Sequence, residues 1–271
     1  PATSPQDSDM AHPAVPDFLR VLDSFDRSKT RTEILRIFCE MAYCALAKRA
    51  SPFAGQRDRL EAEYMSCVGM FPNKDDVRRM PEMMAMALQT IAAGGVDFFG
   101  QVAAEIGALD DRLGQFFTPY EVSRMMAEMS LGDVSAQIEA QGFITISEPA
   151  AGAGGMVLAV ADVIEEQGFD PARHIWVEAV ELARTTFHMA YVQIAARGIA
   201  GCVINGNSLS LETYDQAFTP AAPIFHALNG HPFAKQREAA RKAAKAEAAA
   251  RASCRELLRS AEPATARAVW R

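Results

Sequence analysis

Apolar residues in the first 110 positions recur every three or four residues, which is the spacing of one helix face. The clearest run lies in 30–48, where the apolar face holds Ile34, Ile37, Phe38, Met41 and Leu46. Further helices are predicted at 16–22, 58–70, 75–93 and 96–107, with stops at Phe71-Pro72-Asn73 and Gly94-Gly95. The pattern therefore predicts a purely helical N-terminal region.

From residue 141 the pattern becomes an alternation of strands and helices. Strands are predicted at 143–147, 175–180 and 202–205, and helices at 156–167 and 185–197. This order is typical of a parallel sheet with crossover helices, half of a doubly wound α/β fold. After Leu211 the signal weakens: 221–228 is ambiguous, and 234–260 predicts a helix rich in Ala, Arg, Lys and Glu.

These patterns predict three regions: a helical region at 1–110, an α/β domain at 111–233 and a basic helical tail at 234–271. The tail cannot supply the further strands of a complete doubly wound sheet, so we expect an α/β domain truncated at its C-terminal half. A truncated sheet exposes an edge beside its first strand, and proteins normally cover such edges. We expect the cover to come from the tail, the N-terminal helices, or a second subunit, as a protein partner or in a homodimer.

Charge is distributed unevenly along the chain. The net formal charge is −7, but 234–271 holds ten Lys and Arg against four Glu, a balance of +6, so the remainder carries −13. The acidic part of the chain, residues 1–233, is poorly suited to binding DNA by itself, because neutralisation of DNA phosphates supplies most non-specific affinity. Any DNA contact therefore needs a local basic surface such as the tail; the alternative is an ordinary solvated helix. The candidate stripe consists of Arg237, Arg241, Lys245 and Arg251.

The five cysteines include no Cys-x-x-Cys pair, and no two histidines have metal-ligand spacing. This argues against a disulfide framework and a metal site, and it is typical of a reducing cytoplasm. No apolar stretch is long enough for a membrane span, and residues 1–16 resemble a loose arm more than a signal peptide. We therefore expect a cytoplasmic protein without membrane association.

The most informative segment is Glu148-Pro149-Ala150-Ala151-Gly152-Ala153-Gly154-Gly155, between a predicted strand and a predicted helix. Its glycines permit a tight turn and close approach to a ligand, and the helix N-terminus offers free N–H groups. Val157 stands where a dinucleotide fingerprint requires glycine, which argues against NAD(P). A carboxylate at Glu148 suits a cationic ligand, such as a sulfonium amino acid, better than a pyrophosphate. The alternative is that the segment is only a tight turn that connects the strand to the helix.

Two polar positions follow the next two predicted strands. Glu181 ends the second strand, where an acid binds ribose hydroxyls in doubly wound folds; taken alone, it is more typical of a solvated helix start. Asn207, within Gly206-Asn207-Ser208, can reach an adenine edge with its amide or simply form a turn. The combination with the glycine loop favours ligand binding.

These segments carry a resemblance to the modification subunits of type I restriction systems, which are N6-adenine DNA methyltransferases, and to their short plasmid- and phage-borne relatives. Four segments are similar to the family's motifs in order and spacing: Gly114–Pro119 with Glu121-Val122, Glu148–Gly155, Val180-Glu181-Leu182 and Gly206–Leu209. The family uses S-adenosylmethionine to methylate the exocyclic amine of adenine in DNA. The resemblance implies a Rossmann-like methyltransferase fold, S-adenosylmethionine as cofactor, DNA as partner and a restriction–modification context.

The resemblance also implies a set of cofactor-binding residues. Phe117, Thr118 and Pro119 would pack near the methionine end, Glu148, Pro149, Ala150, Gly152 and Gly154 beneath it, Glu181 on the ribose, and Asn207 and Ser208 at the adenine.

The catalytic motif departs from the family pattern. The family places Asn-Pro-Pro-Phe after its fourth strand, where the amide and a prolyl carbonyl accept hydrogen bonds from the target amine and the aromatic ring stacks on the flipped base. The nearest segment here is Asn229-Gly230-His231-Pro232-Phe233, in which two residues separate asparagine from proline. Asn229, Pro232 and Phe233 are thus the candidate catalytic residues of a degenerate loop, and a plain turn is the alternative.

Two functions follow from these expectations. One is an adenine-specific DNA methyltransferase, acting alone or completed by a partner. The other is a catalytically inactive S-adenosylmethionine-binding module that binds DNA or regulates a restriction–modification complex. If Asn229 and Phe233 lie at the mouth of the cofactor pocket, the first is favoured.

Overall fold

The computed structural model describes residues 11–108 and 117–234, and beyond them residues 238, 241–243, 245, 251 and 253. The chain divides into two compact units, Pro1–Asn229 and Gly230–Arg271. The helical region and the α/β region predicted from the sequence thus belong to one unit. The described residues of the second unit beyond Phe233 are helical, and the rest of the predicted tail helix lies outside the described residues.

The N-terminal region is helical, as predicted. Its helices are α1 (Ala14–Asp23), α2 (Arg31–Ala50), α3 (Ala54–Gly69), α4 (Lys74–Ala92) and α5 (Phe98–Glu105). Polar side chains fix three of the starts: Thr30 and Glu33 form a capping box on α2, Asn73 caps α4 and Asp97 caps α5. Local sequence therefore accounts for three of the five helix starts.

The α/β part contains the sheet that was predicted and one strand that was not. Strands β1 (Ile144–Glu148), β2 (Ile175–Glu181) and β3 (Ala200–Asn207) are parallel, and β4 (Glu212–Phe218) runs antiparallel beside β3, in the order β1-β2-β3-β4. The remaining helices are α6 (Tyr120–Leu131), α7 (Ser135–Gln141), α8 (Gly155–Glu166), α9 (Pro171–His174), α10 (Arg184–Ala196) and α11 (Ala222–Asn229). The predicted mixed α/β fold with an N-terminal helical region is confirmed.

Strand β4 was not predicted from the sequence because its residues are polar and mostly exposed. Its sequence, Glu-Thr-Tyr-Asp-Gln-Ala-Phe, buries only Ala217, so it shows no apolar alternation. Pairing with β3 through a tight hairpin defines it as a strand. The ambiguous segment 221–228 is resolved as helix α11.

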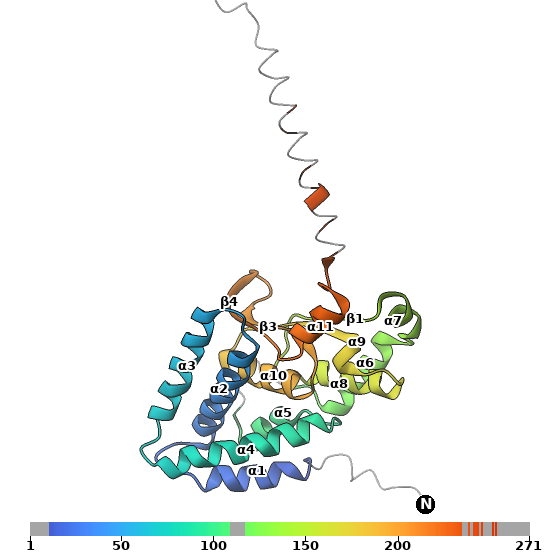
Figure 1. Cartoon of the computed structure of the whole chain (residues 1–271). Helices are drawn as coiled ribbons and strands as arrows, with labels where there is room; N and C mark the ends of the chain where they lie inside the picture. Colours follow the sequence, from blue (N-terminus) through green and yellow to red (C-terminus); the bar gives the residue numbers. More distant parts are fainter. Residues whose placement is uncertain are drawn as a thin grey trace, which may run out of the picture. The chain divides into compact units, whose positions relative to one another are not determined.

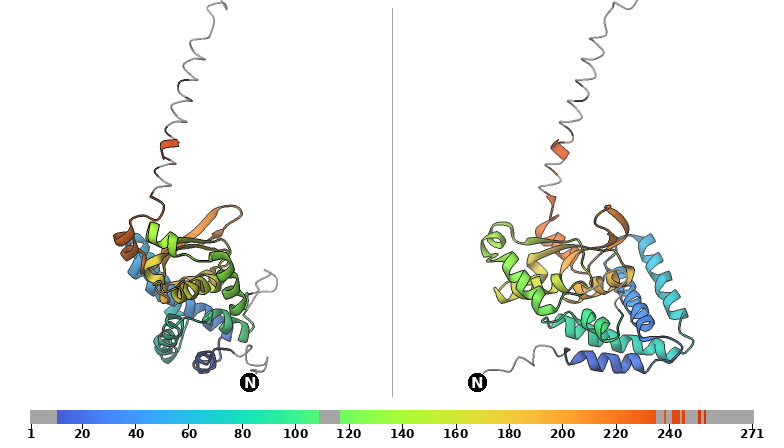
Figure 2. Two further views of the ribbon diagram at one scale, coloured as in Figure 1. Left: turned by 90° about the vertical axis from the view of Figure 1, so that its right-hand side faces the viewer. Right: turned by 180° about the vertical axis from the view of Figure 1, so that it is seen from behind.

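Helices α8 and α10 cover one face of the sheet, and α1, α4 and α5 lie beyond them (Figures 1 and 2). Ile175, Val177 and Ala179 of β2 point into this core and are fully buried. Residues Thr186 to Ile194 of α10 are all buried, because α10 is enclosed between the sheet and helix α2. The sheet and the N-terminal helices therefore share one hydrophobic core.

The other face of the sheet is covered only in part. Helix α11 packs over the amino ends of the strands, where Phe225 contacts Phe143 and Trp176. Thr145 and Ser147, which alternate with the core-facing isoleucines of β1, are exposed on this face. Within the described residues no strand pairs with the outer side of β1, so the source of the expected edge cover stays a prediction.

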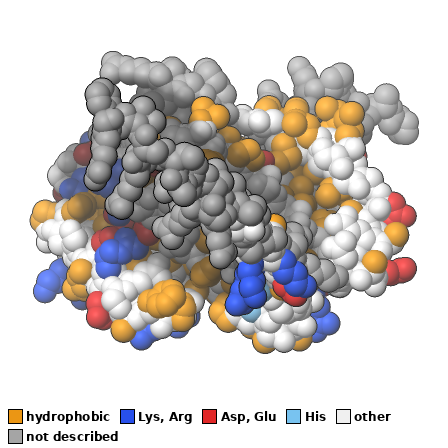
Figure 3. Space-filling model, turned by 90° about the horizontal axis from the view of Figure 1, so that it is seen from above, with side chains coloured by type: hydrophobic (Ala, Val, Ile, Leu, Met, Phe, Trp, Pro, Cys, Tyr) orange, Lys and Arg blue, Asp and Glu red, His pale blue; other side chains and the backbone are white. Residues whose placement is uncertain are grey.

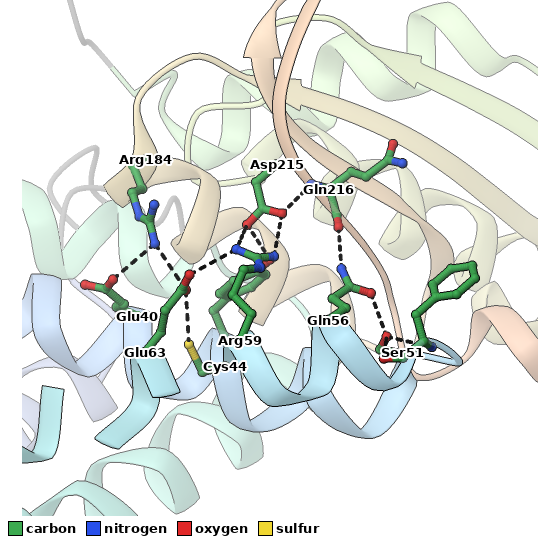
Figure 4. Close-up of polar contacts among 11 residues, drawn as sticks. Glu40, Cys44, Ser51, Gln56, Arg59, Glu63, Arg184, Asp215 and Gln216 are labelled. Carbon is green, nitrogen blue, oxygen red and sulfur yellow. Dashed lines mark hydrogen bonds and ion pairs between the residues drawn. The ribbon is translucent and has the colours of Figure 1, made fainter. Parts of the chain in front are cut away.

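A polar network joins the N-terminal helices to the sheet (Figure 4). The Asp215 carboxylate of β4 accepts two hydrogen bonds from the Arg59 guanidinium of α3 and one from the Tyr43 hydroxyl of α2. Arg184, at the start of α10, pairs with Glu40 and Glu63. The network fixes α2 and α3 against the β3–β4 hairpin and α10.

Candidate functional site

The glycine loop after β1 has the backbone shape that its sequence predicts. Gly152 and Gly154 have φ values of +56° and +99°, a region that residues with a Cβ rarely adopt. A Cβ on Gly154 would also lie 3.4 Å from the Cα atom of Ala190, so this loop packs directly on α10. Glycine at these positions lets the chain turn from β1 into α8.

Glu181 holds the loop in place from the end of β2. Its Oε2 accepts a hydrogen bond from the Gly152 N–H at 2.9 Å, and its Oε1 accepts from the Ala183 N–H and the Thr186 hydroxyl. The Ala151 N–H donates to the Val180 carbonyl at 2.9 Å. The predicted ribose-binding acid and the glycine loop are therefore brought into direct contact.

The Phe117-Thr118-Pro119 segment lies over the same loop. The Phe117 ring carbon is 3.3 Å from the position that a Cβ on Gly152 would take, and Pro119 precedes the first residue of α6. Helix α6 is fixed by Tyr120, whose hydroxyl donates to the buried Asp162 carboxylate of α8 at 2.5 Å. The first three residues of the motif, Gly114 to Phe116, lie outside the described residues.

Between this segment and the loop lies a cavity of about 260 Å³. Its lining combines the two predicted motifs with residues of α5, α6 and α8: Asp97, Phe117, Thr118, Ser123, Met126, Glu148, Ala150, Ala151, Gly152, Ala153, Gly155 and Met156. Pro149 is exposed in the loop beside it. The lining combines apolar side chains and backbone with four polar ones, Asp97, Thr118, Ser123 and Glu148, so the cavity can offer a small molecule both kinds of contact.

Asn207 is the last residue of β3 and Ser208 follows it, at the same end of the sheet as Glu181, since Asn205 pairs with Glu181 in the register of β2 and β3. The Asn207 Oδ1 accepts hydrogen bonds from the Leu209 and Ser210 N–H groups. This oxygen is therefore occupied by the hairpin turn, and contact with an adenine through Asn207 stays a prediction.

Asn229 lies at the opposite end of the sheet from the cavity. Its amide donates to the carbonyl of Arg173, in α9 directly before β2, at 3.5 Å, and its Oδ1 faces Gly142 ahead of β1. The glycine loop follows the carboxyl end of β1, and a seven-residue strand such as β2 spans about 20 Å. Helix α11 packs against the amino ends of the strands, so Asn229, its last residue, lies away from the cavity, and its catalytic role stays a prediction. Pro232 and Phe233 belong to the second unit, and their role stays a prediction.

Two residues of this site were missed by sequence analysis. Asp97 lines the cavity with only 5% of its surface exposed, and the fully buried Gln193 donates to both Asp97 Oδ1 and the Ala153 carbonyl at 2.7 Å. The position of Asp97 before an apolar run signals a helix cap. No sequence signal shows that the cap faces the glycine loop, because α5 and α8 are brought together only by tertiary packing.

Comparison with known proteins gives the site its context. The family described as N-6 DNA Methylase matches residues 100–240, which is more than half of the chain and includes every segment of the cavity except Asp97. The chain belongs to the N-6 DNA methylase family. The predicted resemblance is thereby confirmed at the level of the family.

Other comparisons add less. A solved structure from Listeria monocytogenes, described provisionally as a class I S-adenosylmethionine-dependent methyltransferase, is 15% identical with a TM-score of 0.34. The match covers 70% of this chain and 52% of that chain. A search of curated proteins finds no match. Across the part of the chain that the structure describes, no helix is long and apolar enough to cross a membrane, and no cluster of His, Cys, Asp and Glu could hold a metal ion.

Proposed function

We propose that this N-6 DNA methylase family member binds S-adenosylmethionine in the cavity between Phe117 and the glycine loop and methylates adenine at N6 in DNA. The observation that carries the proposal is the hydrogen bond from Gly152 to Glu181, which joins the cavity to the acid predicted to bind ribose. The residues that would hold the cofactor are those that line this junction: Phe117, Thr118, Glu148, Ala150, Gly152 and Glu181. When bound, S-adenosylmethionine supplies an electrophilic methyl group on a sulfonium.

The lining supports a cationic ligand of this kind. The charged side chains among the described lining residues are Asp97 and Glu148, both acids. The backbone supports close approach, because Gly152 carries no Cβ beneath the Phe117 ring. Both features suit a sulfonium amino acid better than a phosphate group.

A second function is favoured by the position of Asn229. With its amide at the amino ends of the strands, Asn229 cannot accept a hydrogen bond from an adenine amine placed beside the cavity in this arrangement. The alternative is a catalytically inactive S-adenosylmethionine-binding module that binds DNA or regulates a restriction–modification complex. On the face that Figure 3 shows, the described Lys and Arg side chains lie in separate small groups among acidic and hydrophobic ones.

Calorimetric titration with S-adenosylmethionine, followed by a DNA methylation assay, separates these functions. Glu181→Gln keeps the size of the side chain but removes an acceptor from Gly152, so we expect binding to weaken at least tenfold, about 1.4 kcal/mol. Glu212→Gln, on the exposed hairpin, is the matched control and should bind as the wild type does.

Binding followed by N6-methyladenine in the DNA supports the enzyme. Binding without methylation, on DNA of varied sequence, supports the inactive module. If calorimetry detects no S-adenosylmethionine binding to the wild type, both functions are wrong.

A further inference from the structure

Asp97 is a cavity residue that no expected motif includes. It precedes α5, and its Oδ1 accepts hydrogen bonds from the Gly100 N–H at 2.9 Å and from Gln193 Nε2 at 2.7 Å. Both donors are buried, so the carboxylate is held rigidly. Among the described residues, no donor reaches its second oxygen, Oδ2.

The second oxygen lies between the starts of α5 and α8. A Cβ on Gly100 would lie 2.2 Å from Asp97 Oδ2, and a Cβ on Gly155, the first residue of α8, would lie 2.7 Å from it, so both positions require glycine beside this carboxylate. Gln193 fixes this arrangement, because its amide also donates to the Ala153 carbonyl at 2.7 Å. Asp97 and Gln193 therefore form one hydrogen-bonded network with the loop, and Asp97 lines the cavity.

Burial makes this carboxylate selective for positive charge. Desolvation raises the pKa of Asp97, opposed by its hydrogen bonds from Gln193 and Gly100. An ionised carboxylate in such surroundings gains most from a nearby cation, since Coulomb interactions strengthen as the local dielectric falls. Among the described lining residues no Lys, Arg or His supplies that cation. A sulfonium suits this carboxylate because it carries a fixed positive charge. It has no N–H or O–H group, so it can approach the carboxylate without donating a hydrogen bond.

We infer that Asp97, with Glu148, makes the cavity select the charged S-adenosylmethionine over its uncharged-sulfur product, S-adenosylhomocysteine. The inference rests on the proposed function, since it assigns a role to a residue of the same site. The two ligands share adenosine and the amino acid group and differ by a methyl group and one positive charge. Selection by charge favours exchange of product for fresh cofactor.

The test compares both ligands on the same protein preparations by calorimetry. Asp97→Asn preserves the shape and the cap, because asparagine caps helices as well as aspartate does. We expect the affinity for S-adenosylmethionine to fall at least tenfold and that for S-adenosylhomocysteine less than threefold. Asp170→Asn is the matched control: Asp170 caps α9 outside the cavity, and both affinities should stay at the wild-type values.

Equal losses for both ligands in Asp97→Asn would show a purely structural role and overturn the inference. If Asp97→Asn does not fold, Glu148→Gln gives the same test, because its amide oxygen can still accept from the Ala150 N–H. An unchanged preference there would likewise overturn the inference. Failure of the wild type to bind either ligand would instead refute the proposed function, and the inference with it.

Discussion

At the scale of single residues, the least expected group is a histidine in the hydrophobic core. His188 of α10 is 1% exposed and stacks on Tyr43 with ring centroids 4.7 Å apart. Within the described part of the chain neither ring nitrogen has a hydrogen-bond partner. Burial, together with the nearby positive charges of Arg184 and Arg36, lowers the pKa of His188 to about 3. The native protein therefore keeps this imidazole neutral.

This histidine predicts acid sensitivity. In the unfolded chain the imidazole titrates near 6.5, so between that pH and 3 the unfolded chain binds a proton that the native protein does not. The free energy of unfolding should thus fall as the pH is lowered, by about 2 kcal/mol between pH 7.5 and pH 5. His188→Phe keeps a stacking ring and should flatten this dependence in urea titrations.

His174 provides the control for this measurement. Its ring bonds the Asp170 carbonyl at the protein surface, so His174→Gln should leave the pH dependence of stability as in the wild type. An equally steep dependence in His188→Phe would show that other groups govern the acid response.

At the scale of elements, the contact of the N-terminal helices with the β3–β4 hairpin depends on few polar groups. The Asp215 side chain is 15% exposed. Its carboxylate forms an ion pair with the Arg59 guanidinium at 2.8 Å and accepts a hydrogen bond from the Tyr43 hydroxyl at 3.0 Å. The Arg59 side chain is 40% exposed, so solvent screens part of the attraction. This pair is nevertheless the main charged link between α3 and β4 among the described residues (Figure 4).

We expect a double-mutant cycle of Arg59→Met and Asp215→Asn to give a coupling free energy of about 1 kcal/mol in chemical denaturation. The pair Arg78 and Asp75, with side chains 76% and 64% exposed, is the matched control, and its coupling should be below about 0.5 kcal/mol. Equal coupling in both cycles would mean that the hairpin contact is held by packing alone.

At the scale of the whole molecule, the division at Asn229 separates the proposed cofactor site from the proposed DNA-binding residues. The cavity, Glu181 and Asp97 all belong to the unit Pro1–Asn229, whereas the basic residues expected to meet DNA belong to Gly230–Arg271. The net formal charge is −13 over Pro1–Asn229 and +6 over Gly230–Arg271. Cofactor binding and DNA affinity are therefore expected to respond to different changes.

Neutralising the tail tests this separation. Arg241→Gln combined with Lys245→Gln should leave S-adenosylmethionine affinity unchanged and weaken DNA binding, with the slope of log affinity against log salt reduced by about 0.9 for each lost phosphate contact. Calorimetry and fluorescence anisotropy at several salt concentrations give the two readings. Arg20→Gln with Arg78→Gln, on the exposed surface of α1 and α4, is the charge-matched control. Unchanged DNA affinity in the tail variant would place the DNA contact elsewhere.

The sequence by itself determined the elements whose signals are local. The apolar spacing of 30–48, the strand–loop–helix order around Gly152 and the acid at Glu181 predicted α2, the cofactor-type loop and its partner, because periodicity and glycine conformation depend on neighbouring residues. The family motifs added Phe117 and Thr118, and the structure places both in the cavity.

Only the tertiary structure decided what depends on contacts between distant segments. Strand β4 exists through its pairing with β3, since its own residues are mostly exposed and polar. Asp97 reaches the glycine loop because Gln193 of α10 joins α5 to α8, a contact across almost a hundred residues that no local pattern encodes. Asn229 follows α11 to the amino ends of the strands because Phe225 packs on Phe143 and Trp176 there. Packing, which is long-range in sequence, thus decided which polar groups share the site.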